Sequence, residues 1–226
     1  MLKDLLHLIV SNTCFGCQKP LNSQENQMCF HCLSQIEPTH FHLNPMANEA
    51  YYKFGGKVSL EGATSFFYFD KYSRLQSIVQ ALKYESAPQV GVALGEYTGA
   101  QLQGSDFIQG VEAIVPVPLH RRKLIQRGYN QAERIAKGLG KALHIPIRTD
   151  LIKRVQHTST QTKKNREQRW KNMQYAFQAA KALPPSILLV DDVITTGSTL
   201  AACIQALRME RTDIEIRVFS IGIARK

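Results

Sequence analysis

The stretch Ser186–Leu207, SILLVDDVITTGSTLAACIQAL, decides the fold that this sequence predicts. Its apolar run Ile187–Val190 is typical of a strand buried on both faces of a parallel sheet. The apolar residues after the loop recur at the i, i+3, i+4, i+7 spacing of a helix that packs one face on such a sheet. They are Leu200, Cys203, Ile204 and Leu207. The stretch therefore predicts strand, loop and helix, the repeating unit of α/β folds.

The loop between this strand and this helix has the composition of a phosphate site. Backbone N–H groups at the start of a helix lack intrahelical acceptors and lie at the positive end of the helix dipole. Gly197 allows the main chain to approach a ligand closely. Thr195 and Thr199 add hydroxyl donors, and Thr196 or Ser198 is expected to cap the helix.

Two adjacent carboxylates precede the loop. Asp191 and Asp192 only accept hydrogen bonds when ionised, so they would repel a phosphate but suit a pair of neighbouring hydroxyl groups. A ribose 5-phosphate satisfies both halves of the stretch. A strand that ends in two acids before a capped helix also needs no ligand, and that interpretation stays open. The P-loop pattern G-x-x-x-x-G-K-[ST] is absent, which disfavours nucleotide hydrolysis of that kind.

The run LLVDDVITTGST resembles the phosphoribosyl pyrophosphate (PRPP) binding motif of type I phosphoribosyltransferases. The resemblance implies that Asp191 and Asp192 hold the 2′ and 3′ hydroxyls of the ribose. It also implies that residues 195–199 surround the 5′-phosphate and that Mg²⁺ accompanies PRPP.

The overall composition is that of a globular protein with basic character. The chain has 226 residues, of which 44% are hydrophobic and 20% charged, enough for one ordinary domain and a small appendage. Its net charge of +10 favours anionic partners, although a basic surface often binds nothing specific. Fifteen Lys and Arg against three acids fall between positions 121 and 171, so the basic character is concentrated there.

Four cysteines near the N-terminus form the second strong pattern. The pairs CFGC and CFHC are separated by eleven residues, a spacing that predicts two knuckles around one structural Zn²⁺. Disulfides are the alternative, but they form mainly in secreted proteins. The apolar run at the start of the sequence is too short and too polar for a signal peptide. A Cys₃His site, in which His31 replaces one of the cysteines as a zinc ligand, is a further alternative. The predicted zinc ligands are Cys14, Cys17, Cys29 and Cys32.

Two basic clusters are candidates for contacts to pyrophosphate or DNA. The first follows a strand predicted over Val111–Val117 and is expected in the loop beyond its carboxyl end, where α/β sheets place ligands. It comprises Arg121, Arg122, Lys123 and Arg127. The second lies in a polar segment predicted to be a loop with a short helix around 165–170. It comprises Lys163, Lys164 and Arg166, with Trp170 either stacking bases or pinning that helix. A solvated basic turn is the alternative for both clusters.

Taken together, these motifs resemble the ComF/GntX family of competence-associated, phosphoribosyltransferase-like proteins. The resemblance rests on the four cysteines, LKY at 82–84, VPVPL with HRRxxxxRGYNQ at 115–131, TxTQT from 158, AF at 176–177 and the PRPP motif. It implies work in the cytoplasm during natural transformation, where imported single-stranded DNA meets recombination or competence proteins.

The sequence as a whole predicts an α/β protein with a mostly parallel central sheet and a type I phosphoribosyltransferase-like fold. We expect a zinc ribbon with a short N-terminal helix over 1–40, a linker over 41–57 and the main domain over 58–226. No membrane span is predicted. The favoured function is a PRPP-binding competence factor that handles single-stranded DNA. The alternative is an active phosphoribosyltransferase of nucleotide metabolism or salvage.

Overall fold

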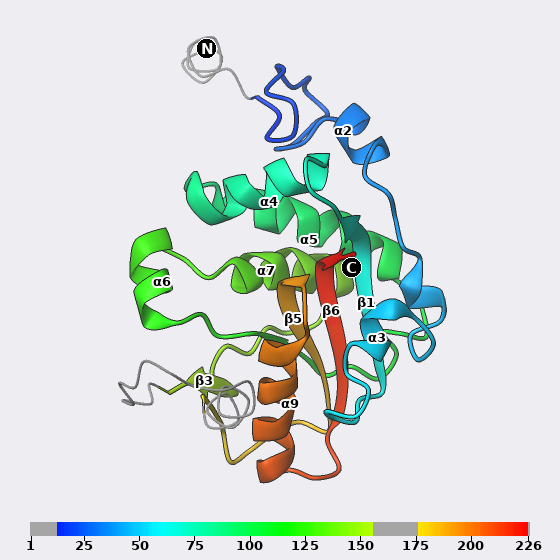
Figure 1. Ribbon diagram of the computed structural model, residues 1–226, viewed down its shortest axis with the longest axis vertical. Helices are drawn as coiled ribbons and strands as arrows, with labels where there is room; N and C mark the ends of the chain where they lie inside the picture. The colour runs from blue at the N-terminus through cyan, green and yellow to red at the C-terminus, as the bar shows by residue number, and fades with distance from the viewer. Residues whose placement is uncertain (1–12, 156–175, 226) are drawn as a thin grey trace.

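A four-stranded parallel sheet forms the centre of the molecule (Figure 1). The computed structural model describes residues 13–155 and 176–225. The strand order is β1-β6-β5-β2, and a separate antiparallel pair is formed by β3 and β4. The predicted α/β class with a mostly parallel sheet is confirmed. The strands are β1 (Gly62–Phe69), β2 (Ala113–Pro116), β3 (Ile152–Arg154), β4 (Phe177–Ala179), β5 (Ser186–Ile194) and β6 (Glu215–Ala224).

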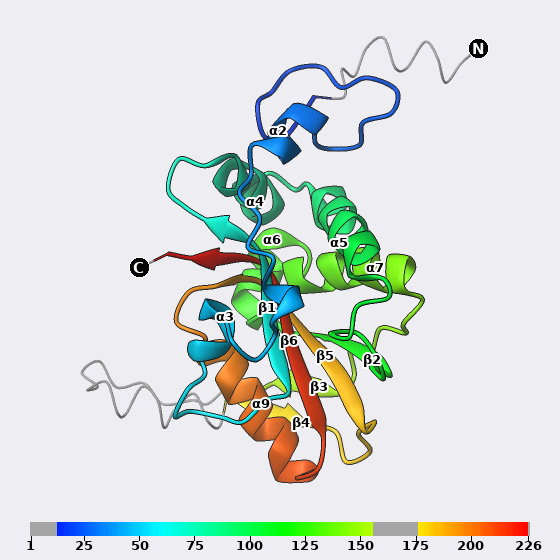
Figure 2. The same cartoon turned by 90° about the vertical axis from the view of Figure 1, so that its right-hand side faces the viewer.

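Helices cover both faces of the sheet (Figure 2). Helices α4, α5 and α7 pack on one face, and α9 packs on the other together with β3 and β4. The short α6 projects at one side, as Figure 1 shows, and none of its residues is buried. The helices are α2 (Phe30–Ser34), η1 (Phe41–Leu43), α3 (Glu49–Tyr52), α4 (Arg74–Tyr84), α5 (Pro88–Leu102), α6 (Arg121–Arg127), α7 (Gln131–Leu143) and α9 (Ser198–Glu210).

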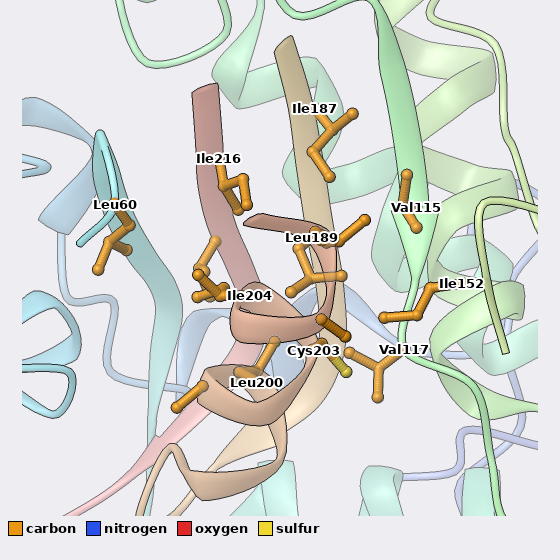
Figure 3. Packing of buried hydrophobic residues seen from close by; sticks show 14 of the residues in the cluster. Leu60, Val115, Val117, Ile152, Ile187, Leu189, Leu200, Cys203, Ile204 and Ile216 are labelled. Atoms are coloured by element: carbon orange, nitrogen blue, oxygen red, sulfur yellow. The ribbon is translucent and has the colours of Figure 1, made fainter. Parts of the chain in front are cut away.

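Strand β5 is buried on both faces, as its apolar run predicts. Ile187 and Leu189 belong to the core beneath α9, and Leu188 and Val190 to the core beneath α4, α5 and α7. The predicted inward residues of α9 are all buried, and Figure 3 shows Leu200, Cys203 and Ile204 against β5 and β6. The strand continues through both aspartates to Ile194, because its pairing with β6 continues to that residue.

Helices α5 and α7 approach each other closely at two glycines. A Cβ atom on Gly95 would lie 2.2 Å from the carbonyl oxygen of Ile135, and one on Gly138 would lie 2.1 Å from that of Val92. Any side chain at either position would therefore push the two helices apart.

The segment 41–57 contains η1 and α3, and it packs against the edge strand β1. Asn48 caps α3 and donates a 2.9 Å hydrogen bond to the carbonyl of Ala63 in β1. Ala50 and Phe54 are fully buried in the core beneath α9. Between Val58 and Tyr72 the structure has one strand, β1.

Two local expectations are wrong. The basic cluster after β2 is a helix, α6, and not a loop; His120 caps its start and Gly128, at φ 76°, ends it. The N-cap of α9 is Gly197, at φ 72°, without a side-chain cap, because Thr196 and Ser198 pair through their hydroxyls at 3.0 Å. Two further expectations lie outside the described residues: the helix before position 13, and the second basic cluster with its tryptophan, Lys163, Lys164, Arg166 and Trp170.

Candidate functional site

The parallel strands bring their carboxyl ends to one edge of the sheet, and the acid pair lies there. The main chain of β5 passes from Asp191 and Asp192 through Ile194 into the loop that starts α9. Because β2 neighbours β5, the chain leaving β2 toward α6 emerges beside this loop. The structure therefore brings the predicted PRPP residues together and places the first basic cluster on the adjacent connection.

The loop after β5 is a small concave surface made of backbone and hydroxyl groups. Residues 193–200 and Asp191 line a hollow of about 40 Å³. The N–H groups of the first turn of α9 have no intrahelical acceptors, and the N–H of Ser198 makes only a long 3.4 Å hydrogen bond to Thr196 Oγ1. Donors at the positive end of α9 thus face a hollow of phosphate size.

A lysine far away in the sequence supports this loop from outside. Lys57 Nζ donates a 2.9 Å hydrogen bond to the carbonyl oxygen of Thr196, and Gly197 packs against Phe54 and Lys53. Burial and the neighbouring charge of Lys53 lower the pKa of Lys57. Sequence reasoning missed these residues because they lie in the predicted linker, far along the chain from the loop.

The two aspartates occupy different environments. Asp192 forms a 2.9 Å ion pair with Lys83 at the end of α4, and both side chains are mostly buried. Burial, followed by the charge of Asp192, raises the pKa of Asp191 to about 7, although Lys83 and Arg154 oppose the shift. A carboxylate whose pKa is raised by burial and a neighbouring charge is common at functional sites.

The end of α4 connects the acid pair with α6. Lys83 holds Asp192, and the guanidinium of Arg127 lies 5.3 Å from the centre of the Tyr84 ring. The hydroxyl of Tyr129 donates a 2.6 Å hydrogen bond to the carbonyl of Leu82. The residues LKY at 82–84, noted above only as part of a family pattern, thus fix the position of the basic helix relative to the carboxylates.

Helix α6 carries its charges into solvent. Arg121, Arg122 and Lys123 occupy its first turn, and none of them makes an ion pair within the described part of the chain. Three cations at the positive end of a helix oppose the helix dipole at a cost of roughly 0.3–1 kcal/mol each. Arg127 instead donates a 2.8 Å hydrogen bond to Gln131 Oε1.

The four cysteines form a separate candidate metal centre. Their sulfur atoms all lie within 4.8 Å of one another, and those of Cys17 and Cys29 are 3.8 Å apart. Tetrahedral Zn–S bonds of about 2.3 Å place neighbouring sulfurs about 3.8 Å apart, so the cluster fits zinc. None of the four forms a disulfide, and His31 is exposed and lies outside the ligand group.

Backbone donors prepare the cysteine cluster for a cation. Burial acts against ionisation of Cys14, but N–H groups of Cys29 and Gly16, each 3.3 Å from its sulfur, lower its pKa to about 7. Burial and neighbouring thiols raise the pKa of Cys32. A divalent cation would remove the repulsion between crowded thiolates, as expected of a structural zinc site.

Comparison with known proteins places the chain in a family. Competence protein F of Haemophilus influenzae is 32% identical to it over 228 residues, covering 97% of this chain and 93% of that protein. The chain belongs to the ComF family. Competence protein ComFC of Streptococcus pneumoniae is 25% identical over 107 residues, covering 47% of this ComF-family chain and 46% of that protein.

A second group of relatives has another name. The DNA utilization protein YhgH of Escherichia coli is 28% identical to this ComF-family protein over 137 residues, covering 59% of this chain and 60% of that protein. No protein-family model matches the chain. Within residues 13–155 and 176–225, every helix is too short or too polar to cross a bilayer.

Proposed function

We propose that this ComF-family protein binds PRPP with Mg²⁺ at the carboxyl edge of its sheet and handles single-stranded DNA in the cytoplasm during competence. The observation that carries the PRPP part is the acid pair of β5 placed directly before the donor-rich loop of α9. The names of its relatives, a competence protein and a DNA utilization protein, support the DNA part.

Each half of the site would hold a different part of PRPP. The carboxylates of Asp191 and Asp192 would accept hydrogen bonds from the ribose hydroxyls. The amides and hydroxyls of residues 195–199 would donate to the 5′-phosphate, and Lys57 holds this loop in place through Thr196. When bound, Mg²⁺ would offset the charge of the pyrophosphate group.

Helix α6 would supply the contact to a nucleic acid or to pyrophosphate. Its first-turn cations are exposed and oppose the helix dipole, so they do not contribute to folding stability. Phosphates would supply the missing counter-charge. Protein partners in recombination or competence would then receive a strand that is bound mainly through its backbone.

Calorimetry with PRPP and Mg²⁺ tests the PRPP site. We expect binding by the wild-type protein and none by Asp191→Ala/Asp192→Ala. The matched control is Asp150→Ala/Asp213→Ala, which removes two surface carboxylates held by Arg148 and Arg211 and should bind normally. Equal binding by both double variants would reject the site. Release of pyrophosphate with an added acceptor would instead establish the transferase alternative.

A charge-matched pair of triple variants tests the role of α6. Arg121→Gln/Arg122→Gln/Lys123→Gln should weaken binding of a single strand and reduce the slope of log affinity against log salt by about 2, since each lost phosphate contact contributes about 0.7. The control removes three ion-paired cations elsewhere, Lys137, Lys141 and Arg148. An equal loss in both would show that net charge, and not α6, determines binding.

A further inference from the structure

A second cavity, which shares no lining residue with the hollow after β5, lies where the ribbon (residues 13–36) joins the main domain. Its volume is about 250 Å³, and its walls come from the end of α2, the segment 36–42, strand β1 and helix α5. None of the residues that line it is a carboxylate, lysine or arginine. The motifs found in the sequence do not explain this cavity.

The cavity is built around β1, the edge strand of the parallel sheet. Residues 37–39 pair antiparallel with β1: Thr39 donates to the carbonyl of Phe66 at 3.0 Å, and Tyr68 donates to that of Glu37 at 3.0 Å. His40 then adopts a left-handed backbone, φ 56°, and turns the chain into η1. This turn places two histidines beside the aromatic residues of β1.

Aromatic rings form the sides of the cavity, two pairs of them near-parallel and Phe66 edge-on to Tyr97 at 78°. His42 stacks on Phe66 with ring centres 5.9 Å apart and an angle of 5° between the ring planes. Phe67 stacks on Tyr97 of α5 at 6.3 Å and 16°. The exposed fractions of Phe66 and Phe67 are only 6% and 2%, so the faces left for a further planar group belong to the half-buried rings of His42 and Tyr97.

The polar groups of the cavity are suited to an uncharged partner. The side chains of His40, His42 and Gln101 make no hydrogen bond to any other residue in the described ranges. Burial and the neighbouring His40 lower the pKa of His42, which favours the neutral ring with one donor and one acceptor. Drug-sized ligands occupy pockets of about 300–1,000 Å³, so this cavity suits a smaller ligand.

We propose that this cavity is a nucleobase site, in which a single base stacks on the aromatic walls and is held at its edge by His40, His42 and Gln101. A nucleobase is flat, uncharged and rich in donors and acceptors, as the lining requires. The base could belong to a single strand or to a free nucleotide. If the base belongs to a single strand, the cavity is part of the DNA handling in the proposed function, and this inference rests on that function. Binding in the cavity does not depend on PRPP.

Fluorescence anisotropy with labelled oligodeoxythymidylate tests the site in the zinc-loaded, full-length protein. The comparison strand has the same length and charge but lacks bases. Gln101→Trp fills the cavity from an exposed helix position, and Tyr97→Leu removes one ring while keeping apolar volume. The control Tyr72→Leu changes a tyrosine that is 96% exposed outside the cavity.

We expect both cavity variants to bind the thymine strand roughly tenfold more weakly, the size of one lost base–aromatic stack. Their binding of the abasic strand should match that of the wild type, as should the control with either strand. Displacement of the label by thymidine monophosphate would identify a free nucleotide as the source of the base. A failure to displace it would identify the strand.

The proposal is overturned if the two strands bind equally, if both cavity variants bind the thymine strand like the wild type, or if neither base source binds. Its failure is distinguishable from that of the proposed function. Base-independent binding that is lost when the α6 cations are removed would leave DNA handling intact and reject only the cavity.

Discussion

At the scale of single residues, the site combines two carboxylates that the fold treats differently. Asp192 has a cation beside it, whereas Asp191 is half-buried at the edge of the hollow and accepts a 2.9 Å hydrogen bond from the N–H of Asp192. Burial of a carboxylate next to another carboxylate disfavours its ionised form. Asp191 therefore lowers the stability of the folded protein when it is charged.

Replacing Asp191 by asparagine should stabilise the protein at alkaline pH. The pKa of Asp191 is raised from 3.8 to about 7, so the folded state holds its proton more tightly than the unfolded state does. Protonation of Asp191 therefore contributes to the free energy of unfolding. This contribution is fully present below pH 3.8 and is lost as pH rises through about 7. In urea denaturation, Asp191→Asn should be more stable than the wild type by up to about 4 kcal/mol near pH 8, the free energy that corresponds to a shift of this size.

The control for this change is a carboxylate shifted in the opposite direction. The hydrogen bonds from Arg148 lower the pKa of Asp150 to about 2, so Asp150→Asn should not stabilise the protein at any pH above this value. A similar pH profile for wild type and Asp191→Asn would contradict the assigned shift.

The ion pair of Lys83 should matter more than its surface counterparts. Lys83→Met leaves Asp192 without its cation beside a second carboxylate, at 15% exposure. We expect a loss of roughly 2 kcal/mol in the free energy of unfolding near pH 8, and a smaller loss near pH 5, where Asp191 is protonated. Lys141→Met breaks a more exposed pair with Glu96 and should cost under about 1 kcal/mol. Equal losses in the two variants would show that burial of the Lys83 pair is unimportant.

At the scale of elements, the contact of α5 with α7 holds one whole face of the sheet in place. Gly95→Ala should destabilise the protein by about 3 kcal/mol or more, because the new methyl group meets rigid backbone on α7. Gly55→Ala, whose new Cβ would only come within 3.4 Å of a carbonyl, should change the stability by under about 1 kcal/mol. Thermal unfolding of both variants measures the difference, and a mild effect at Gly95 would mean that the helices can separate.

The elements also show how much of the site can be read from sequence. The strand, loop and helix of residues 186–207 were predicted correctly because periodicity and loop composition are local signals. Lys83 and Lys57 were missed as site residues because only folding brings them to the loop. The helical state of α6 was missed because its first turn is basic, against the dipole, and it buries no apolar face. Its caps, His120 and Gly128, were the available signal.

At the scale of the whole molecule, the ribbon is not an independent appendage. Met28 and Ile36 are buried in the same core as Leu75 and Ile78 of α4. Arg74 at the start of α4 donates a 3.2 Å hydrogen bond to the carbonyl of Gly16. The nucleobase cavity is closed on one side by the end of the ribbon, so its shape depends on how the ribbon is docked.

Removal of zinc should therefore destabilise the entire chain and not the ribbon alone. A segment this short cannot fold around its own core, so chelation should release Met28 and Ile36 from the shared one. We expect one calorimetric transition in both states, with a melting temperature lower by roughly 5 °C or more after chelation. Cys14→Ser/Cys32→Ser should already melt at the lower temperature and should not respond to the chelator. If the main transition stays at the same temperature after zinc is lost, the ribbon and the sheet unfold separately. The metal would then stabilise only the ribbon.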